Sequence, residues 1–125
     1  MRIMVADDQD RVRHALRTLL DAQPGLEVIA EAVDVADLLS TVQSVCPDVV
    51  LLDWELPGLA ISAILPVLHR CCPGTSIIVL SCYPEARSVA LAAGADHFVS
   101  KSHPPERLLD TILGCGERCQ GNGKQ

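Results

Sequence analysis

The sequence predicts an α/β fold in which five short parallel strands alternate with five helices. Short apolar runs, several of which contain β-branched residues, recur along the chain. Between them lie longer stretches whose apolar residues recur every three or four positions. This alternation is typical of a doubly wound sheet with helices on both faces. Most of the runs also end in polar side chains, and in open α/β sheets ligands bind at the carboxyl ends of the strands.

The expected strands are short, mainly apolar segments bounded by charged residues or by proline and glycine. In chain order they lie at about residues 2–6, 26–30, 49–52, 76–81 and 97–100. The third strand lies between Pro47 and the turn signal Pro57-Gly58, and its unbroken apolar run predicts burial on both faces. The first strand is expected near the centre of the sheet, in the order 2-1-3-4-5.

The expected helices carry one apolar stripe each, which faces the sheet. In chain order they lie at about residues 10–22, 34–45, 61–70, 84–93 and 104–113. Asp10 suits the N-cap of the first helix and Gly94 the C-cap of the fourth. We therefore expect one domain over residues 1–113. Residues 114–125 turn to Gly, Asn, Gln and Lys, which predicts a flexible tail or the start of a linker.

Composition and charge restrict the class of protein. The chain has 125 residues, of which 49% are apolar and 2% aromatic, so aliphatic side chains must fill the core. The net charge of −6 argues against direct nucleic-acid binding by this chain, because phosphate contacts need clustered lysine and arginine. We see neither a transmembrane span nor a signal peptide, so the sequence predicts a cytoplasmic protein.

Cysteines and arginines each leave two interpretations open. The six cysteines form no C-x-x-C pair, so reduced thiols are the simpler interpretation and a thiol-based redox sensor the alternative. The arginines near the first helix predict a solvated helix face or a patch that meets an acidic partner. These residues are Cys46, Cys71, Cys72, Cys82, Cys115 and Cys119, and Arg2, Arg11, Arg13 and Arg17.

Five polar side chains stand at the ends of four expected strands. They are Asp7 and Asp8 after the first strand, Asp53 after the third, Ser81 at the end of the fourth and Lys101 after the fifth. Because the carboxyl ends of parallel strands share one edge of the sheet, we expect these groups to meet there. The edge would then carry three acids, one hydroxyl and one ammonium group.

These positions resemble the receiver domain of bacterial two-component response regulators, which has a flavodoxin-like fold. The resemblance covers about residues 2–113 and includes Pro57, four residues after Asp53. It implies transfer of a phosphoryl group from a phosphohistidine of a sensor histidine kinase to Asp53. A domain of this kind is not an enzyme for a separate substrate, because it catalyses only its own phosphorylation and dephosphorylation.

The resemblance also implies how each group acts. Asp8, Asp53 and the backbone carbonyl of Glu55 would bind Mg²⁺ directly, with Asp7 acting mainly through water, and such an oxygen-rich site suits this cation. Lys101 would hold one phosphoryl oxygen. The Ser81 hydroxyl would donate to a second oxygen, and backbone N–H groups near Trp54 and Cys82 would complete the cradle.

The implied output is a switch at Ser81 and Phe98. Ser81 would move toward the phosphoryl group and Phe98 would swing inward, which changes the face formed by the fourth helix, fifth strand and fifth helix. That face would carry a homodimer or bind a partner. Lys101-Ser102, with the later Pro-Pro-Glu-Arg-Leu-Leu, is similar to receivers joined to helix-turn-helix DNA-binding domains, which implies control of transcription in a longer protein.

Two other functions remain open from the residues. One is a phosphorylation-independent protein-interaction module with a vestigial acidic site. The other is a Mg²⁺-dependent phosphohydrolase with Asp53 as nucleophile, which would need an aspartate where Glu55 stands. The sequence does not name the kinase, the signal or the oligomeric state. Nor does it fix the lifetime of the phosphoryl group, since Glu55, Cys82 and Tyr83 flank the site.

Overall fold

The computed structural model of the protein describes residues 1–123 and confirms the α/β fold. Five strands form one parallel sheet in the predicted order β2-β1-β3-β4-β5. The strands are β1 (Arg2–Ala6), β2 (Glu27–Ala32), β3 (Val49–Asp53), β4 (Ser76–Ser81) and β5 (His97–Ser100). All five residues of β3 are buried, as the apolar run predicts.

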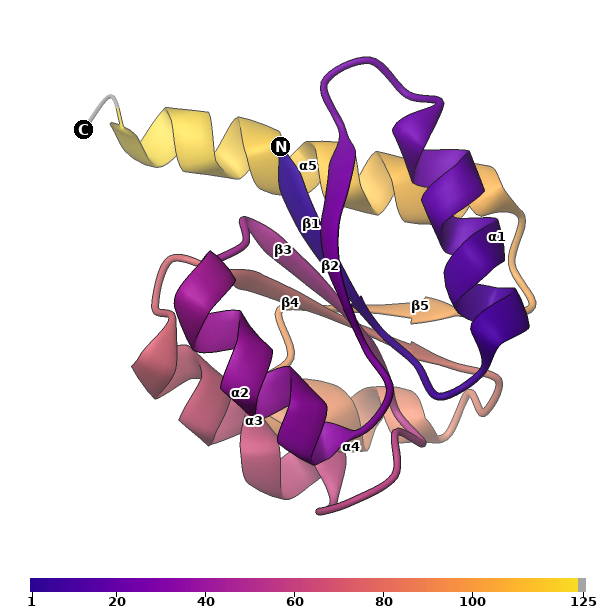
Figure 1. The fold of residues 1–125 in the computed structure, drawn as a ribbon, viewed down its shortest axis with the longest axis vertical. Coiled ribbons are helices and arrows are strands. Elements are labelled where there is room, and N and C mark those ends of the chain that lie inside the picture. Colours follow the sequence, from indigo (N-terminus) through magenta and orange to yellow (C-terminus); the bar gives the residue numbers. More distant parts are fainter. Residues whose placement is uncertain (124–125) are drawn as a thin grey trace.

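Helices cover both faces of the sheet, with α1 and α5 on one face and α2, α3 and α4 on the other (Figure 1). They are α1 (Asp10–Asp21), α2 (Val35–Val45), α3 (Ile61–Cys71), α4 (Ala86–Ala93) and α5 (Pro105–Gly123). Two aliphatic core clusters fill the space between the layers, one on each face. None of the helices within residues 1–123 combines the length and hydropathy needed to cross a bilayer.

The loop after β3 is held close to the start of α2. The N–H of Val35 donates to the carbonyl of Pro57 at 2.9 Å. Gly58 has φ +123°, and a Cβ atom at this position would lie 2.8 Å from the Cβ of Val35. Only glycine suits both this backbone conformation and this close approach. The Pro57-Gly58 signal therefore fixes where the chain leaves the end of β3.

Helix α5 is longer than the sequence predicts. The expected end near residue 113 is wrong, because the helix continues to Gly123. Gly114 and Gly116 favoured an early end, but an interior glycine costs only about 1 kcal/mol of helix stability. Cys115 is 1% exposed, so the face of α5 that packs on the sheet continues past the expected end. Lys124 and Gln125, the end of the expected tail, lie outside the described residues.

Two other boundaries differ from the prediction. Gln9, not Asp10, is the N-cap of α1, and Asp10 is the first helical residue. The Asp10 carboxylate pairs with Arg13 on the same helix, so an ion pair replaces the expected cap contact. Strand β2 begins at Glu27 and runs to Ala32, because its last residues pair with the end of β1.

Candidate functional site

Three aspartates meet at the carboxyl end of the sheet. Asp7 and Asp8 follow β1, Asp53 ends β3, and the two strands are paired neighbours. One carboxylate oxygen from each aspartate lies within 4.8 Å of the other two. Asp7 and Asp53 are buried, whereas Asp8 is exposed. The donor set consists of hard oxygen atoms, which fits Mg²⁺ better than a thiophilic metal.

Backbone N–H groups orient the two buried carboxylates. The N–H of Gln9 donates to Oδ1 of Asp7 at 2.9 Å, and the N–H of Glu55 donates to Oδ1 of Asp53 at 3.1 Å. Each is a local turn in which an aspartate accepts from the residue two positions later. The Glu55 side chain is exposed. Local turn chemistry thus positions both carboxylates within the site.

Lys101, which follows β5, bridges the two buried aspartates. Its Nζ lies 3.0 Å from Oδ2 of Asp7 and 3.2 Å from Oδ1 of Asp53. Its backbone N–H donates to the carbonyl of Ser81 at 2.9 Å, which ties the loop after β5 to the end of β4. Burial acts to lower the pKa of Lys101, but the hydrogen bond to Asp7 and the charge of Asp53 outweigh burial and raise it. Lys101 is therefore a cation at neutral pH.

At Asp53, unlike Lys101, the effect of burial on the pKa outweighs that of the neighbouring groups. Burial raises the pKa of its carboxyl above the ordinary value, and the negative charge of Asp7 acts in the same direction. The N–H of Glu55 and the ammonium group of Lys101 favour the carboxylate but do not cancel the effect of burial. Ionised Asp53 therefore costs folding free energy near neutral pH. A bound cation would offset that cost.

The predicted switch residues lie on neighbouring strands, Ser81 at the end of β4 and Phe98 within β5. Ser81 is 2% exposed, and its Oγ accepts a hydrogen bond from the N–H of Tyr83 at 2.9 Å. Phe98 in β5 is half-buried and packs against the core cluster on the α2–α4 side. The Trp54 N–H donates to the carbonyl of Leu80 at 2.9 Å, and the expected cradle of backbone N–H groups near Trp54 and Cys82 stays a prediction. The hydrogen bond of Trp54 continues the pairing of β3 with β4.

Sequence reasoning missed the role of Arg13. Its Nη1 donates to the carbonyl of Asp7 at 2.7 Å, and its Nε donates to Glu31 of β2 at 2.9 Å. Arg17, one helical turn later, pairs with the same glutamate at 2.6 Å. Arg13 is therefore neither a solvated face nor a patch for a partner, because only 12% of its side chain is exposed. The spacing of Arg13 and Arg17 was the one available signal of a shared partner.

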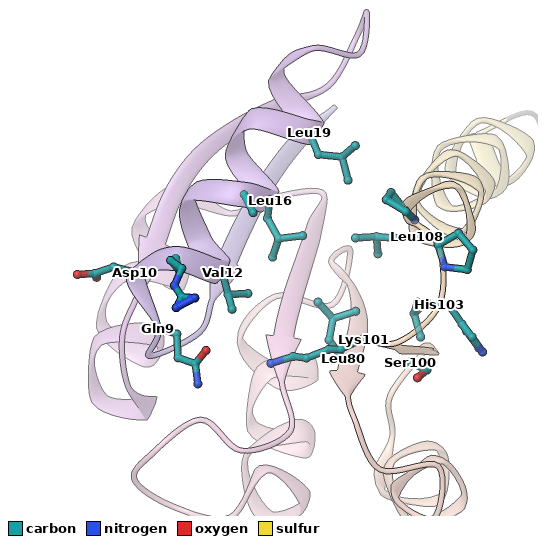
Figure 2. A pocket seen from close by; sticks show the side chains of 15 residues that line it. Gln9, Asp10, Val12, Leu16, Leu19, Leu80, Ser100, Lys101, His103 and Leu108 are labelled. Carbon is teal, nitrogen blue, oxygen red and sulfur yellow. The ribbon is translucent and has the colours of Figure 1, made fainter.

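A groove between α1 and α5 opens beside the aspartates. Its volume is about 960 Å³, and its lining is mainly apolar. Leu16 of α1 faces Leu108 of α5 across the groove, and Leu80 of β4 lies between the two helices (Figure 2). Gln9 and Lys101 also line it, so the groove reaches the acidic site.

The whole strand-end arrangement matches one protein family. The model of the family described as "Response regulator receiver domain" matches residues 3–113, which include all five strand-end residues. This chain belongs to that family. The receiver domain has the strand order and the acidic edge that the sequence led us to expect.

Relatives of this receiver domain include named transcriptional regulators. The chain is 37% identical over 114 residues to the transcriptional regulatory protein YhcZ of Bacillus subtilis, and the match covers 89% of this chain and 53% of YhcZ. It is 34% identical over 113 residues to the nitrate/nitrite response regulator protein NarP of Escherichia coli, with 89% and 53% covered. The chain thus spans about half the length of these curated relatives.

Solved structures of response regulators are also similar to this chain. The crystal structure of a LuxR-family two-component response regulator from Aurantimonas sp. SI85-9A1 matches with a TM-score of 0.84 and 30% identity, covering 90% of this chain and 82% of that chain. The signal receiver domain of the response regulator NarL from Mycobacterium tuberculosis matches with a TM-score of 0.85 and 26% identity, covering 93% and 95%. The likeness to both extends over most of this receiver domain.

Proposed function

We propose that this receiver domain accepts a phosphoryl group on Asp53 from a phosphohistidine of a sensor histidine kinase. The observation that carries the proposal is the position of Lys101, whose ammonium group lies within 3.2 Å of a carboxylate oxygen of both Asp7 and Asp53. A fixed cation beside a buried carboxylate suits a reaction that accumulates negative charge at that carboxylate. Family membership supports the same reaction.

In the proposed transfer, a carboxylate oxygen of Asp53 bonds to phosphorus while the bond from phosphorus to the histidine nitrogen breaks. The electron pair of the broken bond stays on the imidazole, and an acyl phosphate forms on Asp53. Lys101 holds one phosphoryl oxygen as a point charge. Ser81 donates its hydroxyl to another, since its Oγ accepts from Tyr83 and its proton is still available.

The acidic site is proposed to bind Mg²⁺ through Asp8, Asp53 and the backbone carbonyl of Glu55, with Asp7 acting mainly through water. When bound, Mg²⁺ supplies positive charge against the carboxylates and the incoming phosphoryl oxygens. The clustered carboxylate oxygens and the raised pKa of Asp53 support this assignment.

Millimolar Mg²⁺ is expected to raise the melting temperature of the wild-type domain and to leave that of Asp8→Ala unchanged. A ligand that binds only the folded state at ten times its dissociation constant stabilises by about 1.4 kcal/mol. For a domain of this size the shift is about 3–6 °C. Thermal unfolding with Mg²⁺ or with a chelator measures it. Asp110→Ala, on the exposed face of α5, should keep the full shift. An equal shift in the wild type and Asp8→Ala would contradict the assignment.

The signal is proposed to leave the site through Ser81 and Phe98. Ser81 moves toward the phosphoryl group, Phe98 turns inward, and the face of α4, β5 and α5 changes shape. This face then forms a homodimer or binds a partner. Relatives such as YhcZ of Bacillus subtilis are named as transcriptional regulatory proteins, so the proposed output is control of transcription in a longer protein. With its net charge of −6, this chain is not expected to contact nucleic acid directly.

The groove between α1 and α5 is proposed to receive the phosphodonor protein. Its apolar lining ends at Lys101, so a helix seated there would present a phosphohistidine to Asp53. Ala15→Glu places a charge on an exposed groove residue and is expected to slow phosphorylation by the kinase about tenfold or more.

A small-molecule phosphodonor needs no groove, so its rate with Ala15→Glu should stay within about twofold of the wild type. The matched control is Thr18→Glu, an exposed residue of α1 that does not line the groove. Rates of acyl phosphate formation are measured with both donors. A similar loss with both donors would place the effect at Asp53 rather than at docking.

Intact mass spectrometry tests the proposed function as a whole. Wild-type protein is incubated with Mg²⁺ and either a small-molecule phosphodonor or a phosphorylated kinase, and we expect one phosphoryl group per chain. A chelator should prevent it. Sustained hydrolysis of phosphate esters would instead favour a phosphohydrolase. No adduct from any donor on a folded protein would favour an interaction module with a vestigial acidic site.

A further inference from the structure

Three cysteines gather at the end of the sheet opposite Asp53. Cys46 is the C-cap of α2, Cys71 is the last residue of α3, and Cys72 follows it. The chain then enters β3 and β4, which are paired neighbours. The segments that lead into these two strands are joined by a hydrogen bond from Oγ1 of Thr75 to the carbonyl of Pro47 at 2.6 Å. The backbones that carry Cys46 and Cys72 are therefore held close to each other.

Hydrogen bonds place the sulfur atoms of Cys46 and Cys72 at the same turn of α2. Sγ of Cys72 donates to the carbonyl of Val42 at 3.7 Å, and the N–H of Cys46 donates to the same oxygen at 3.0 Å. Sγ of Cys46 donates to the next carbonyl, that of Gln43, at 3.3 Å. Two thiols from α2 and α3 thus occupy adjacent acceptor positions on one helix end.

The neighbouring thiols act on the pKa of Cys72 in the same direction as burial. Burial raises the pKa of Cys72, and the neighbouring Cys46 thiol adds to the effect. Cys71 contributes through charge alone, and its Sγ accepts from Nε2 of Gln43 at 3.3 Å. Because the thiols of Cys46 and Cys72 donate to consecutive carbonyls of α2, whereas Cys71 contacts the Gln43 side chain, the geometry favours Cys46 as the partner of Cys72.

Exposure gives the two thiols different roles. Cys46 is exposed, whereas Cys72 is 6% exposed. An oxidant from solvent reaches Cys46 first, and Cys72 is shielded from it but adjacent to the product.

A metal site is not the better interpretation of these cysteines. Over the residues with described side chains, the one group with metal-binding geometry is the aspartate trio.

We propose that Cys46 and Cys72 form a reversible intramolecular disulfide when the domain meets hydrogen peroxide. The Cys46 thiolate attacks one peroxide oxygen, the O–O bond breaks, and hydroxide leaves and is protonated to water, which gives a sulfenic acid. Cys72 loses its proton and attacks that sulfur. The S–O bond breaks, a second water leaves, and the S–S bond forms. Two thiols have then lost two electrons to peroxide, and a dithiol reductant returns both to thiols while it becomes a disulfide itself.

In the test, the full chain is first reduced and then exposed to hydrogen peroxide. The remaining thiols are alkylated, and the products are analysed by intact mass and peptide mapping. We expect a monomer with two protected thiols and a Cys46–Cys72 linked peptide. Cys46→Ser should abolish the linkage, whereas Cys71→Ser, a matched exposed control, should retain it. In Cys72→Ser, Cys46 should stop at the sulfenic acid, which a dimedone probe captures.

Three results would overturn the proposal: full alkylation of both thiols after peroxide, a linkage that includes Cys71, or loss of the linkage in Cys71→Ser. Because Cys46→Ser changes an exposed side chain, its outcome does not depend on repacking of the core. The Asp53→Asn variant should form the disulfide to the wild-type extent, since the two sites lie at opposite ends of the sheet. This separates the inference from the proposed phosphorylation.

Discussion

Asp53→Asn is expected to abolish phosphorylation by both the kinase and a small-molecule donor. The substitution removes the carboxylate nucleophile and leaves an amide of nearly the same shape, so no acyl phosphate can form at this position. Intact mass after incubation with Mg²⁺ and donor should show the unmodified chain only. Asp110→Asn, which removes an exposed carboxylate from α5, should be modified like the wild type.

Stability shows whether loss of phosphorylation in Asp53→Asn reflects chemistry or misfolding. Burial raises the pKa of Asp53, so the charged form costs folding free energy at pH values above that pKa. A neutral amide does not carry this cost. In chelator at neutral pH, Asp53→Asn should therefore be at least as stable as the wild type in urea unfolding. Wild-type levels of phosphoryl adduct on the variant would show that another residue is the acceptor.

Lys101→Met is expected to destabilise the cation-free domain by about 2 kcal/mol and to slow phosphorylation about a hundredfold or more. The substitution keeps most of the side-chain volume but leaves Asp7 and Asp53 facing each other without a cation. Asp7 is 2% exposed, and the side chain of Lys101 is 23% exposed, which screens part of the loss. Urea unfolding in chelator and the rate of adduct formation measure the two effects.

The effect of Lys101→Met on stability has a defined dependence on pH and on cations. Because the folded-state pKa of Lys101 is raised above its ordinary value of 10.5, the stabilisation by Lys101 is fully present at neutral pH. It is lost only as the pH rises through the folded-state pKa. The gap between wild type and variant should thus be constant from about pH 7 to 9 and narrow above 10.5.

Two further measurements separate charge from packing at Lys101. Mg²⁺ should restore much of the stability of Lys101→Met, since it brings positive charge to the same carboxylates. Lys101→Arg keeps the charge in a different geometry and should retain most of the stability but not the full transfer rate. Equal stability of the wild type and Lys101→Met in chelator would show that the ion pairs contribute nothing.

The sheet and the site were predictable because both follow from short-range patterns. Apolar runs such as that of β3 reveal buried strands, and the strand ends then fix where Asp53 and Lys101 stand. Parallel topology alone brings together residues that are far apart in the chain. Strand order alone predicts that Lys101 and Asp7, 94 positions apart, lie at the same edge, and the structure shows that Lys101 Nζ contacts Asp7 there.

The features that the sequence did not reveal depend on tertiary packing. Helix α5 passes Gly114 because Cys115 is buried in the molecule, and local propensity cannot register that burial. Arg13 anchors the Asp7 carbonyl only because β2 brings Glu31 beside α1. The Trp54 N–H is engaged by Leu80 through a strand end that extends one residue further than expected.

The position of Trp54 gives the receiver domain a native optical probe. It is the chain's single tryptophan, it directly follows Asp53, and it is only partly buried. It lines a small hollow together with Tyr83, the single tyrosine. Intrinsic emission therefore comes from the immediate neighbourhood of Asp53, the proposed acceptor. The proposed binding of Mg²⁺ and the proposed phosphorylation of Asp53 are expected to change this emission, and both can be followed in real time on the unlabelled, unmutated chain.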